Sequence, residues 1–493
     1  MNEILYHDPK QTDVITTKEH GRGFFAMRDI APGETLLKEL PYAWTIMGNY
    51  RSIVCDNCSC IYQEKKHKTN PLEALKDDAD PEAMMAARQK KKKEETEAKK
   101  RADSGLHPNV AIGKTGMKRC GKCKLCYYCS VDCQKEHWNR IHKYECKMLC
   151  QTKYLPENHH ALMLFRTILK CSINSNSPQE NPRDRQTIDL EPNYEAKTKI
   201  EKEVHQCYDF CMSSDLIKDM LNKLCIKWAF EDPYHLIFEY SARLVNNRMA
   251  LGPDEDCNGS AVGTGIYPFA SLLNHNCRPN ALWQTYKKNV VIIRAQEHIK
   301  KGQEIFIAYL DTTMESKDRK DELFKNYGFY CDCGGCASGD VDEVQFQGGK
   351  LEELVEANDI EAINVLPAHN MTVIQKLQRE FDDSIRYDRD PEKAYKLGER
   401  ILSGMSFWLE NEKVKHISRP DFRRACGVQY MFMGELALAL TKDPRITQAY
   451  LHKAETILKI TDSEESTVFN RIKKIRSLLL VLHAAHQQAY GKK

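Results

Sequence analysis

Cysteine and histidine pairs at short spacing are the strongest chemical signal in this sequence. The chain has 20 cysteines and starts without a secretory pattern, so we expect reduced thiols, and metal binding explains their clustering better than disulfides. Four pairs have the spacing at which two side chains of one turn or helix face the same ion: Cys55 and Cys58, Cys120 and Cys123, Cys129 and Cys133, and His142 and Cys146. They predict two tetrahedral zinc sites, with interleaved pairs favoured because these would staple the segment more effectively.

A further cluster follows much later in the chain. Cys331, Cys333 and Cys336 supply three thiolates, so a closed tetrahedral site needs a fourth donor, which we expect to be Cys277. The alternative is that Cys277 is simply a buried thiol. Sites with four protein donors have no open position, which makes all these zinc ions structural. Cys60 and Cys126 are surplus to the pairs; either could be an alternative ligand, but an unliganded thiol is the expected state of both.

The elements that must position these residues change along the chain. Short strands with turns are predicted in two regions, at 13–17, 24–27 and 35–37 and again at 290–294 and 304–308. Helical periodicity dominates 151–250, and helices continue from about residue 345 to the end, with starts at Asp390-Pro391 and Asp443-Pro444. Two imperfect copies of an Ala-Tyr pattern hint at tetratricopeptide-like hairpins there, although an ordinary helical bundle fits equally well.

Composition limits the classes of function. The chain has 493 residues, about three domains by length, with 73 Lys and Arg against 70 Asp and Glu. A net charge of +3 is too small to indicate nucleic-acid binding, and no apolar run is long enough for a membrane span, so we expect a soluble protein of the cytoplasm and nucleus. The charged segment 59–119 contains a helix start at Asp80-Pro81 and a basic stretch at 88–101, which is either a solvated helical arm or a nuclear-import or nucleic-acid patch.

The paired ligands resemble the MYND zinc finger. By that resemblance, Cys55, Cys58, Cys129 and Cys133 hold one ion, and Cys120, Cys123, His142 and Cys146 hold the other. Trp138 occupies a position where the MYND finger also has a tryptophan. The sequence departs from the family pattern in the long insert after Cys58 and in one extra residue between Cys133 and His142, and neither departure removes a ligand.

Other motifs resemble the SET lysine methyltransferase fold. They are Gly21-Arg22-Gly23, the segment 271–280, the run from Gly302 to Asp311 and Tyr327-Gly328-Phe329 ahead of the cysteine triplet. The whole chain therefore resembles a SET and MYND domain protein. This implies an α+β multidomain fold: a β-rich SET fold split by the inserted finger, a post-SET zinc cluster and an all-α, tetratricopeptide-like C-terminal domain. The expected parts are 1–54 and 251–325 for SET, 55–146 for the finger, 147–250 for a helical insert, 326–340 for the post-SET segment and 341–493 for the last domain.

The resemblance also assigns roles to residues. Tyr309 is expected to be the catalytic hydroxyl; taken alone it would be an ordinary strand tyrosine. The residues expected to contact S-adenosylmethionine are His20, Gly21, Arg22, Gly23, Asn247, Asn274, His275, Tyr309 and Phe329. Ser271, Tyr327 and Phe329 are expected to line a substrate channel, Glu191 is a weaker candidate, and the neighbouring Asn246 leaves the register at Asn247 open.

These assignments predict a protein-lysine N-methyltransferase that uses S-adenosylmethionine, carries three structural zinc ions and acts as a monomer on histone or non-histone proteins. A second hypothesis is an inactive scaffold whose finger binds proline-containing peptides. DNA binding through the finger and the basic stretch is the third, and the small net charge disfavours it.

Overall fold

The structure is a computed structural model, and it describes residues 4–17, 21–61, 117–151, 159–175, 190, 192–194, 197–252, 261–310, 312, 314, 316–337, 370–410, 420–440, 442–462 and 466–490. The predictions for His20, Glu191, the helix start at Asp80 and the basic stretch 88–101 lie outside these residues.

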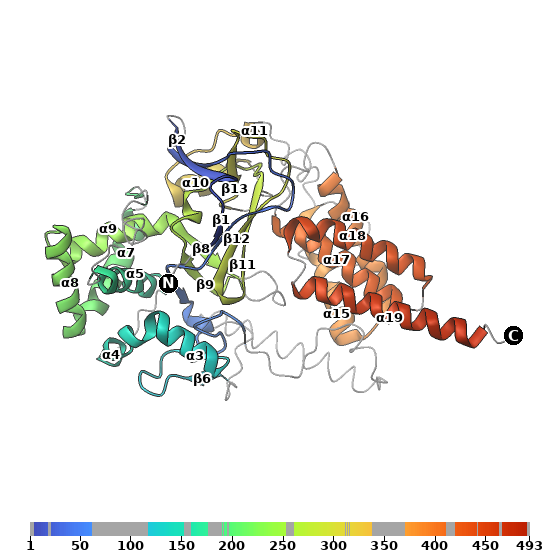
Figure 1. Ribbon diagram of the computed structural model, residues 1–493, viewed down its shortest axis with the longest axis horizontal. Helices are drawn as coiled ribbons and strands as arrows, with labels where there is room; N and C mark the ends of the chain where they lie inside the picture. The colour runs from blue at the N-terminus through green and yellow to red at the C-terminus, as the bar shows by residue number, and fades with distance from the viewer. Residues whose placement is uncertain are drawn as a thin grey trace.

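Strands from the two predicted β regions combine in the same sheets, although more than 200 residues separate them (Figure 1). One sheet has the order β1 (Ile4–His7), β4 (Thr35–Glu39), β12 (Val290–Ala295) and β11 (Ala281–Tyr286). A second has the order β10 (Asn274–His275), β13 (Glu304–Ile307), β3 (Gly21–Ala26) and β2 (Thr12–Thr17). A third joins β5 (Ala43–Ile46), β9 (Gly263–Ile266) and β8 (Arg248–Leu251). The predicted strands are confirmed, and their apolar side chains form one core with the helices that follow.

The helical insert covers this body on one side. It consists of α5 (His159–Ser175), α7 (Lys197–Met212), α8 (Asp215–Trp228) and α9 (Pro233–Asn247). The start of α9 follows from its sequence: Asp232 accepts a hydrogen bond from the backbone N–H of His235 at 2.8 Å, and Pro233 occupies the first turn. The helix ends at Asn247 and continues directly into β8, which fixes where its last two asparagines lie.

The cysteine-rich segment forms a small unit of its own. It contains β6 (Lys118–Arg119), β7 (Tyr127–Tyr128), α3 (Val131–His137) and α4 (Lys143–Gln151), and a π-helical turn from Trp138 to His142 joins the two helices. A π turn takes up one additional residue without ending the helix. The extra residue noted between Cys133 and His142 is therefore absorbed without turning His142 away from its site.

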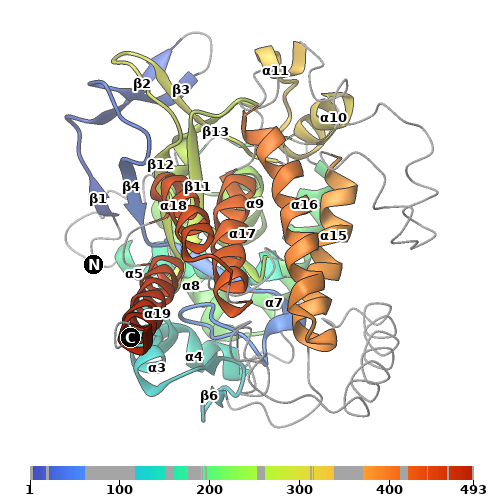
Figure 2. The ribbon, with the colours of Figure 1, turned by 90° about the vertical axis from the view of Figure 1, so that its right-hand side faces the viewer.

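The C-terminal helices have a separate core, and they stand on the side of the sheets opposite α7, α8 and α9 (Figure 1). They are α15 (Met371–Asp383), α16 (Pro391–Glu410), α17 (Pro420–Ala439), α18 (Pro444–Thr461) and α19 (Thr467–Tyr490). From α15 to α18 each packs against the next, which confirms the predicted helical domain and both Asp-Pro starts (Figure 2).

Several contacts attach this helical domain to the sheet region, among them one at Tyr286 and one at Gly33. The hydroxyl of Tyr286 on β11 donates to the carbonyl of Thr461 at 3.1 Å. Gly33, at φ +85°, lies so close to α18 that an added Cβ would be 2.8 Å from the carbonyl oxygen of Lys459. None of the helices among the described residues has the length and apolar character needed to cross a membrane.

Candidate active site and zinc centres

A cavity of about 260 Å³ opens where the second sheet meets the end of α9. Eight of the residues predicted for cofactor or substrate line it: Gly21, Arg22, Asn247, Ser271, Asn274, Tyr309, Tyr327 and Phe329. Asn246, the alternative register to Asn247, also lines it, and Leu190 and Leu272, which had not been predicted, complete the lining. The chain thus gathers most of the predicted polar and aromatic groups, from four distant segments, around one space.

Strand β13 is what brings these segments together, because it lies between β10 and β3. On one side it pairs in parallel with β10, where Asn274 faces Phe306 and His275 faces Ile307. On its other side Glu304 pairs with Phe25 of β3. The two predicted cofactor motifs therefore flank the strand that leads to Tyr309.

Gly23 and Asn274 are linked through the carboxylate of Glu304. The Asn274 amide nitrogen donates to Oε1 of Glu304 at 2.8 Å and to the Arg22 carbonyl at 3.0 Å. A Cβ at Gly23 would collide with that same Oε1. A side chain at this position would displace the Glu304 carboxylate, and Gly23 thus supports the cavity from behind its lining.

Tyr309 is positioned by two hydrogen bonds. Its hydroxyl donates to the carbonyl of Leu273 at 2.6 Å, and its backbone N–H donates to Nδ1 of His275 at 3.0 Å. Burial raises the pKa of the Tyr309 hydroxyl above its usual value, and the neighbouring Tyr327 and Glu304 raise it further. The hydroxyl therefore keeps its proton, which it donates to the Leu273 carbonyl, and toward a group in the cavity its oxygen can act only as an acceptor.

Aromatic rings form one wall of the cavity. The ring centroids of Tyr309 and Tyr327 lie 4.8 Å apart, and Tyr327 and Phe329 follow at 6.5 Å. Tyr327 is the last residue of α10 (Ser316–Tyr327). Phe329 follows it after Gly328, which has φ +79°. A channel walled in this way excludes water and favours a cation over the ring faces.

The third thiol cluster lies directly beside this wall. Cys277, Cys331, Cys333 and Cys336 have sulfur atoms within 4.8 Å of one another, with Cys277 3.3 Å from Cys336. Zinc–sulfur bonds of 2.3 Å in a tetrahedron require sulfur atoms about 3.8 Å apart, so this group fits zinc. The His275 ring contacts the cluster, with Nε2 3.3 Å from the Cys277 sulfur, and burial lowers its pKa to about 4. The ring thus connects the cluster to Tyr309 and is not part of the cavity lining, so a cofactor contact at His275 would have to use its backbone.

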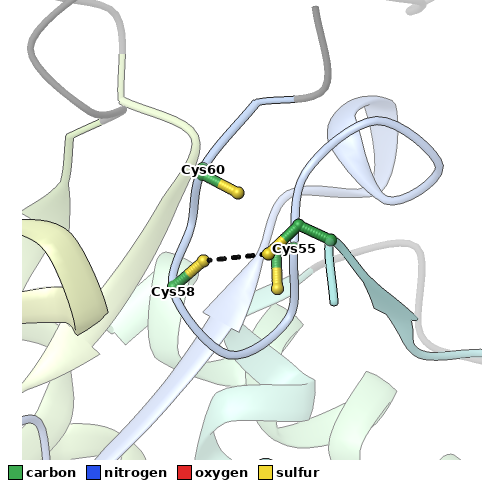
Figure 3. Close-up of side chains that lie close together, drawn as sticks. Cys55, Cys58 and Cys60 are labelled. Carbon is green, nitrogen blue, oxygen red and sulfur yellow. Dashed lines mark hydrogen bonds between the residues drawn. The ribbon is translucent and has the colours of Figure 1, made fainter. Parts of the chain in front are cut away.

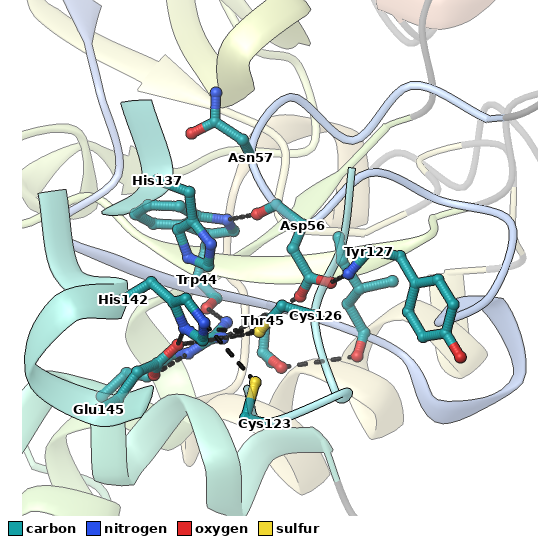
Figure 4. Close-up of polar contacts among 12 residues, drawn as sticks. Trp44, Thr45, Asp56, Asn57, Cys123, Cys126, Tyr127, His137, His142 and Glu145 are labelled. Carbon is teal, nitrogen blue, oxygen red and sulfur yellow. Dashed lines mark hydrogen bonds and ion pairs between the residues drawn. The ribbon is translucent and has the colours of Figure 1, made fainter. Parts of the chain in front are cut away.

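The second predicted zinc set, in the finger, also comes together. The sulfur of Cys120 lies 3.8 Å from that of Cys146, and Cys123 lies 3.6 Å from Nε2 of His142, which suits a tetrahedral ion. The other ring nitrogen of His142 contacts the buried carboxylate of Glu145 at 2.9 Å. Figure 4 shows His142 and Glu145 pointing toward each other, next to Cys123 and Cys126. A carboxylate behind a histidine ligand fixes the ring orientation for a metal.

Arg166 of α5 extends this arrangement into the main body. Its guanidinium donates to both oxygens of Glu145, at 2.8 and 2.9 Å, and to the carbonyl of Trp44 at 2.8 Å. Arg166 and Glu145 are almost completely buried. The pair keeps the pKa of Glu145 well below its usual value despite its burial, so the carboxylate is charged. The buried ion pair of Arg166 and Glu145 thus joins the finger to the main body at α5.

At the first predicted site, a fifth thiol lies beside the four predicted donors. The four sulfur atoms that lie within 4.8 Å of one another belong to Cys55, Cys58, Cys60 and Cys129. Figure 3 shows Cys55, Cys58 and Cys60 together on one loop. Cys133, predicted as the fourth ligand, adjoins this group through Cys129 at 3.5 Å. Cys60, expected to be an unliganded thiol or an alternative ligand, lies within this group because the chain reverses at Ser59 and returns Cys60 to Cys55.

The family model named SET domain matches residues 21–310. The chain belongs to the SET domain family. Its SET domain runs from the glycine motif on β3 to the residue after Tyr309, so it contains most of the cavity and encloses the finger. The fold class predicted from the motifs is confirmed.

Curated relatives agree with this membership. The chain is 25% identical to histone-lysine N-methyltransferase SMYD3 of Mus musculus over 500 residues, covering 96% of this chain and 97% of that protein. It is 26% identical to the Homo sapiens SMYD3 over 366 residues, covering 73% and 70%. It is 28% identical to N-lysine methyltransferase SMYD2 of Homo sapiens over 310 residues, covering 61% and 64%. The resemblance to SET and MYND domain methyltransferases is thereby confirmed, at modest identity.

The sequence analysis missed several residues that shape the cavity or the contact between the finger and the main body. Arg166 is a single charge in the apolar run 160–169, and such a charge signals a buried partner. Glu304 is the first residue of a strand, where a charged residue is ordinarily exposed to solvent. Leu190 and Leu272 carry no chemical signal, and only the fold places them at the cavity.

Proposed function

We propose that this chain is a protein-lysine N-methyltransferase that uses S-adenosylmethionine. The observation that carries the proposal is the single cavity shared by the Gly21-Arg22 backbone, two asparagine amides and the Tyr309 hydroxyl. The names of the relatives support the same reaction.

The cavity suits this cofactor by its chemistry. Gly21 has φ +67° and no side chain, so the backbone is open to close approach. The amides of Asn247 and Asn274 offer polar contacts for an amino-acid group, and aromatic faces favour a sulfonium. When bound, the cofactor supplies a methyl group on a positively charged sulfur. Asn274 would hold its amino-acid part, with Gly21 and Arg22 along its length.

The residues of the chain then prepare the lysine. An ordinary lysine with a pKa of about 10.4 is almost entirely protonated at neutral pH, and a dry aromatic channel near a positive charge favours the neutral amine. Tyr327 and Phe329 provide that channel. With S-adenosylmethionine bound, the neutral amine held in this channel would accept the methyl group that the sulfonium supplies, and the methylated ammonium would release its proton to solvent.

Tyr309 orients the amine in this proposal and does not act as a base. Its own proton is donated to the Leu273 carbonyl, and burial raises its pKa, so the tyrosine oxygen accepts a hydrogen bond from the amine and aligns it for in-line transfer. The sequence analysis had left the proton-acceptor role open, and the geometry favours orientation.

We further propose three structural zinc ions, one for each thiol cluster, and a histone or non-histone protein as substrate. The spacing of the sulfur and nitrogen atoms supports the zinc ions. Proline-containing peptides at the finger and a monomeric state remain proposals from the resemblance.

The test is transfer of tritiated methyl from S-adenosylmethionine to core histones and to a pool of cell-extract proteins. Tyr309→Phe should abolish incorporation while retaining zinc. Tyr330→Phe is the matched control, because Tyr330 is 62% exposed close to the same segment, and it should retain the activity. If the wild type labels nothing and calorimetry detects no cofactor binding, the enzyme is excluded and the inactive scaffold takes its place.

A further inference from the structure

Five thiols, one more than a zinc ion can use, surround the first site of the finger. Cys58 and Cys129 have sulfur atoms 3.7 Å apart, and Cys129 and Cys133 have theirs 3.5 Å apart. Both distances are close to the edge of about 3.8 Å expected for a zinc tetrathiolate. Cys60 also lies within 4.8 Å of Cys55, Cys58 and Cys129. The set therefore contains two candidates for the fourth position.

The position of Cys60 is built into the backbone. The N–H of Cys55 donates to the carbonyl of Cys60 at 3.0 Å, and the N–H of Ser59 donates to the carbonyl of Cys55 at 3.0 Å. Val54 and Ile61 pair as an isolated bridge just outside this loop. Ser59 adopts φ +56°, a conformation that is unfavourable for a residue with a side chain. The loop accepts this strain and thereby returns the Cys60 thiol to the ion position.

Cys133 reaches the same group from a different segment. It lies in the first turn of α3, where its N–H donates to the hydroxyl of Ser130 at 3.1 Å. Asn57 connects the two segments through its donation to Glu136 of α3 at 3.1 Å. Both Cys60 and Cys133 are partly exposed, whereas Cys55 is fully buried. The two thiols are thus held near the site independently of each other.

We propose that Cys60 is a zinc donor of the first site and that it exchanges with Cys133 as the fourth ligand. Cys55, Cys58 and Cys129 are the three constant donors. A zinc ion with four thiolates already has an excess negative charge, so the fifth sulfur remains a thiol. Loss of either exchanging thiol therefore leaves the zinc in place. This inference concerns the metal site and does not depend on the proposed methyltransferase activity.

The experiment measures zinc per chain by native mass spectrometry in the full-length protein. The Cys60→Ser and Cys133→Ser variants should each retain as much zinc as the wild type, and the double variant should contain one zinc fewer. Cys129→Ser, which removes a constant donor, should also lose one. Cys150→Ser is the matched control, because Cys150 is an exposed cysteine of α4 outside the three clusters. Loss of one zinc in Cys133→Ser alone, or in Cys60→Ser alone, overturns the exchange.

A second measurement uses the zinc-loaded wild type, so that it does not depend on how the variants fold. Brief alkylation with N-ethylmaleimide followed by peptide mass spectrometry should modify this set once per molecule, at Cys60 in some molecules and at Cys133 in others. A product confined to Cys60 would show that Cys133 is the permanent ligand and would overturn the proposal. A product confined to Cys133 would overturn the exchange by making Cys60 permanent.

Discussion

Asn274 and Glu304, on adjacent strands of the second sheet, are joined by a hydrogen bond of 2.8 Å from the amide nitrogen of Asn274 to Oε1 of Glu304. The same nitrogen also donates to the carbonyl of Arg22. The Arg22 carbonyl and the Glu304 carboxylate belong to paired strands, β3 and β13. Because both groups need an N–H donor, they identify which end of the Asn274 amide is the nitrogen. Glu304 is thus a positioning residue for a group that lines the cavity.

Replacing Glu304 should therefore weaken cofactor binding more than it slows turnover. Glu304→Ala removes a charge-assisted hydrogen bond of about 1.5–3 kcal/mol, so we expect the Kd for S-adenosylmethionine to rise by about tenfold or more. Glu304→Gln retains an acceptor oxygen and should recover part of the affinity. Calorimetry with S-adenosylmethionine measures both changes.

The matched control for this prediction is Glu297→Ala, which removes an exposed carboxylate from the turn before β13. Its Kd should equal that of the wild type. An unchanged Kd in Glu304→Ala would mean that Asn274 keeps its orientation without the carboxylate, and the positioning role would be lost.

The pH dependence of methyl transfer should follow the substrate lysine and not Tyr309. Burial raises the pKa of Tyr309 above its ordinary value of 10.0, so its neutral form persists through the accessible range. We expect kcat/KM to rise about tenfold per pH unit from pH 7 toward the lysine pKa of about 10.4. A profile with a falling limb centred below pH 10 would contradict a protonated Tyr309.

The same profile measured on Tyr327→Phe separates the two tyrosines. Tyr327 contributes to the raised pKa of Tyr309, but burial is the larger cause. The variant should therefore have lower activity and the same shape of profile. Rates measured with a lysine peptide at constant ionic strength provide this comparison.

Local patterns in the sequence were sufficient for much of the fold, whereas the cavity residues were assigned through the family resemblance. Strands such as β12 have a continuous apolar run, and the Asp-Pro starts of α16 and α18 carry their own caps. The thiol clusters were found because ligand spacing is a short-range property. Tyr309 and Asn274 required the family resemblance, since taken alone a strand tyrosine and a turn asparagine are ordinary.

Relationships between distant residues could not be predicted in this way. The role of Cys60 depends on a chain reversal at Ser59, where the sequence has a serine and not the glycine that favours such a φ. The contact of Glu304 with Asn274 exists only after β10, β13 and β3 assemble. The π turn at Trp138 could likewise be recognised only in the structure, although the sequence showed an extra residue between two predicted ligands.

Removing the third zinc site should impair cofactor binding, because His275 connects that cluster to Tyr309. We expect Cys336→Ser to lose one zinc and to raise the Kd for S-adenosylmethionine by about 10- to 100-fold, the usual cost of disturbing the support of a metal site. Zinc content by native mass spectrometry and Kd by calorimetry are measured on the same sample.

For this site Cys426→Ser is the control, since Cys426 is a buried cysteine in the separate core of the C-terminal helices. It should keep all zinc and bind the cofactor normally. A Cys336→Ser protein that has lost zinc yet binds the cofactor with wild-type affinity would disconnect the cluster from the cavity.

Breaking the buried pair of Arg166 and Glu145 should destabilise the protein and loosen the second zinc ion. Arg166→Met leaves a buried carboxylate without its partner, which typically costs about 3–5 kcal/mol, and we expect a loss of this size in urea denaturation. The double variant Arg166→Met with Glu145→Gln should be more stable than Arg166→Met alone, since no uncompensated charge remains.

In Glu145→Gln alone, competition with a chelator should show about tenfold weaker zinc binding, because His142 loses its carboxylate partner. Lys223→Ala breaks an exposed pair with Asp219 and should change neither quantity. Wild-type stability in Arg166→Met would mean that the finger is held to the body by its other contacts.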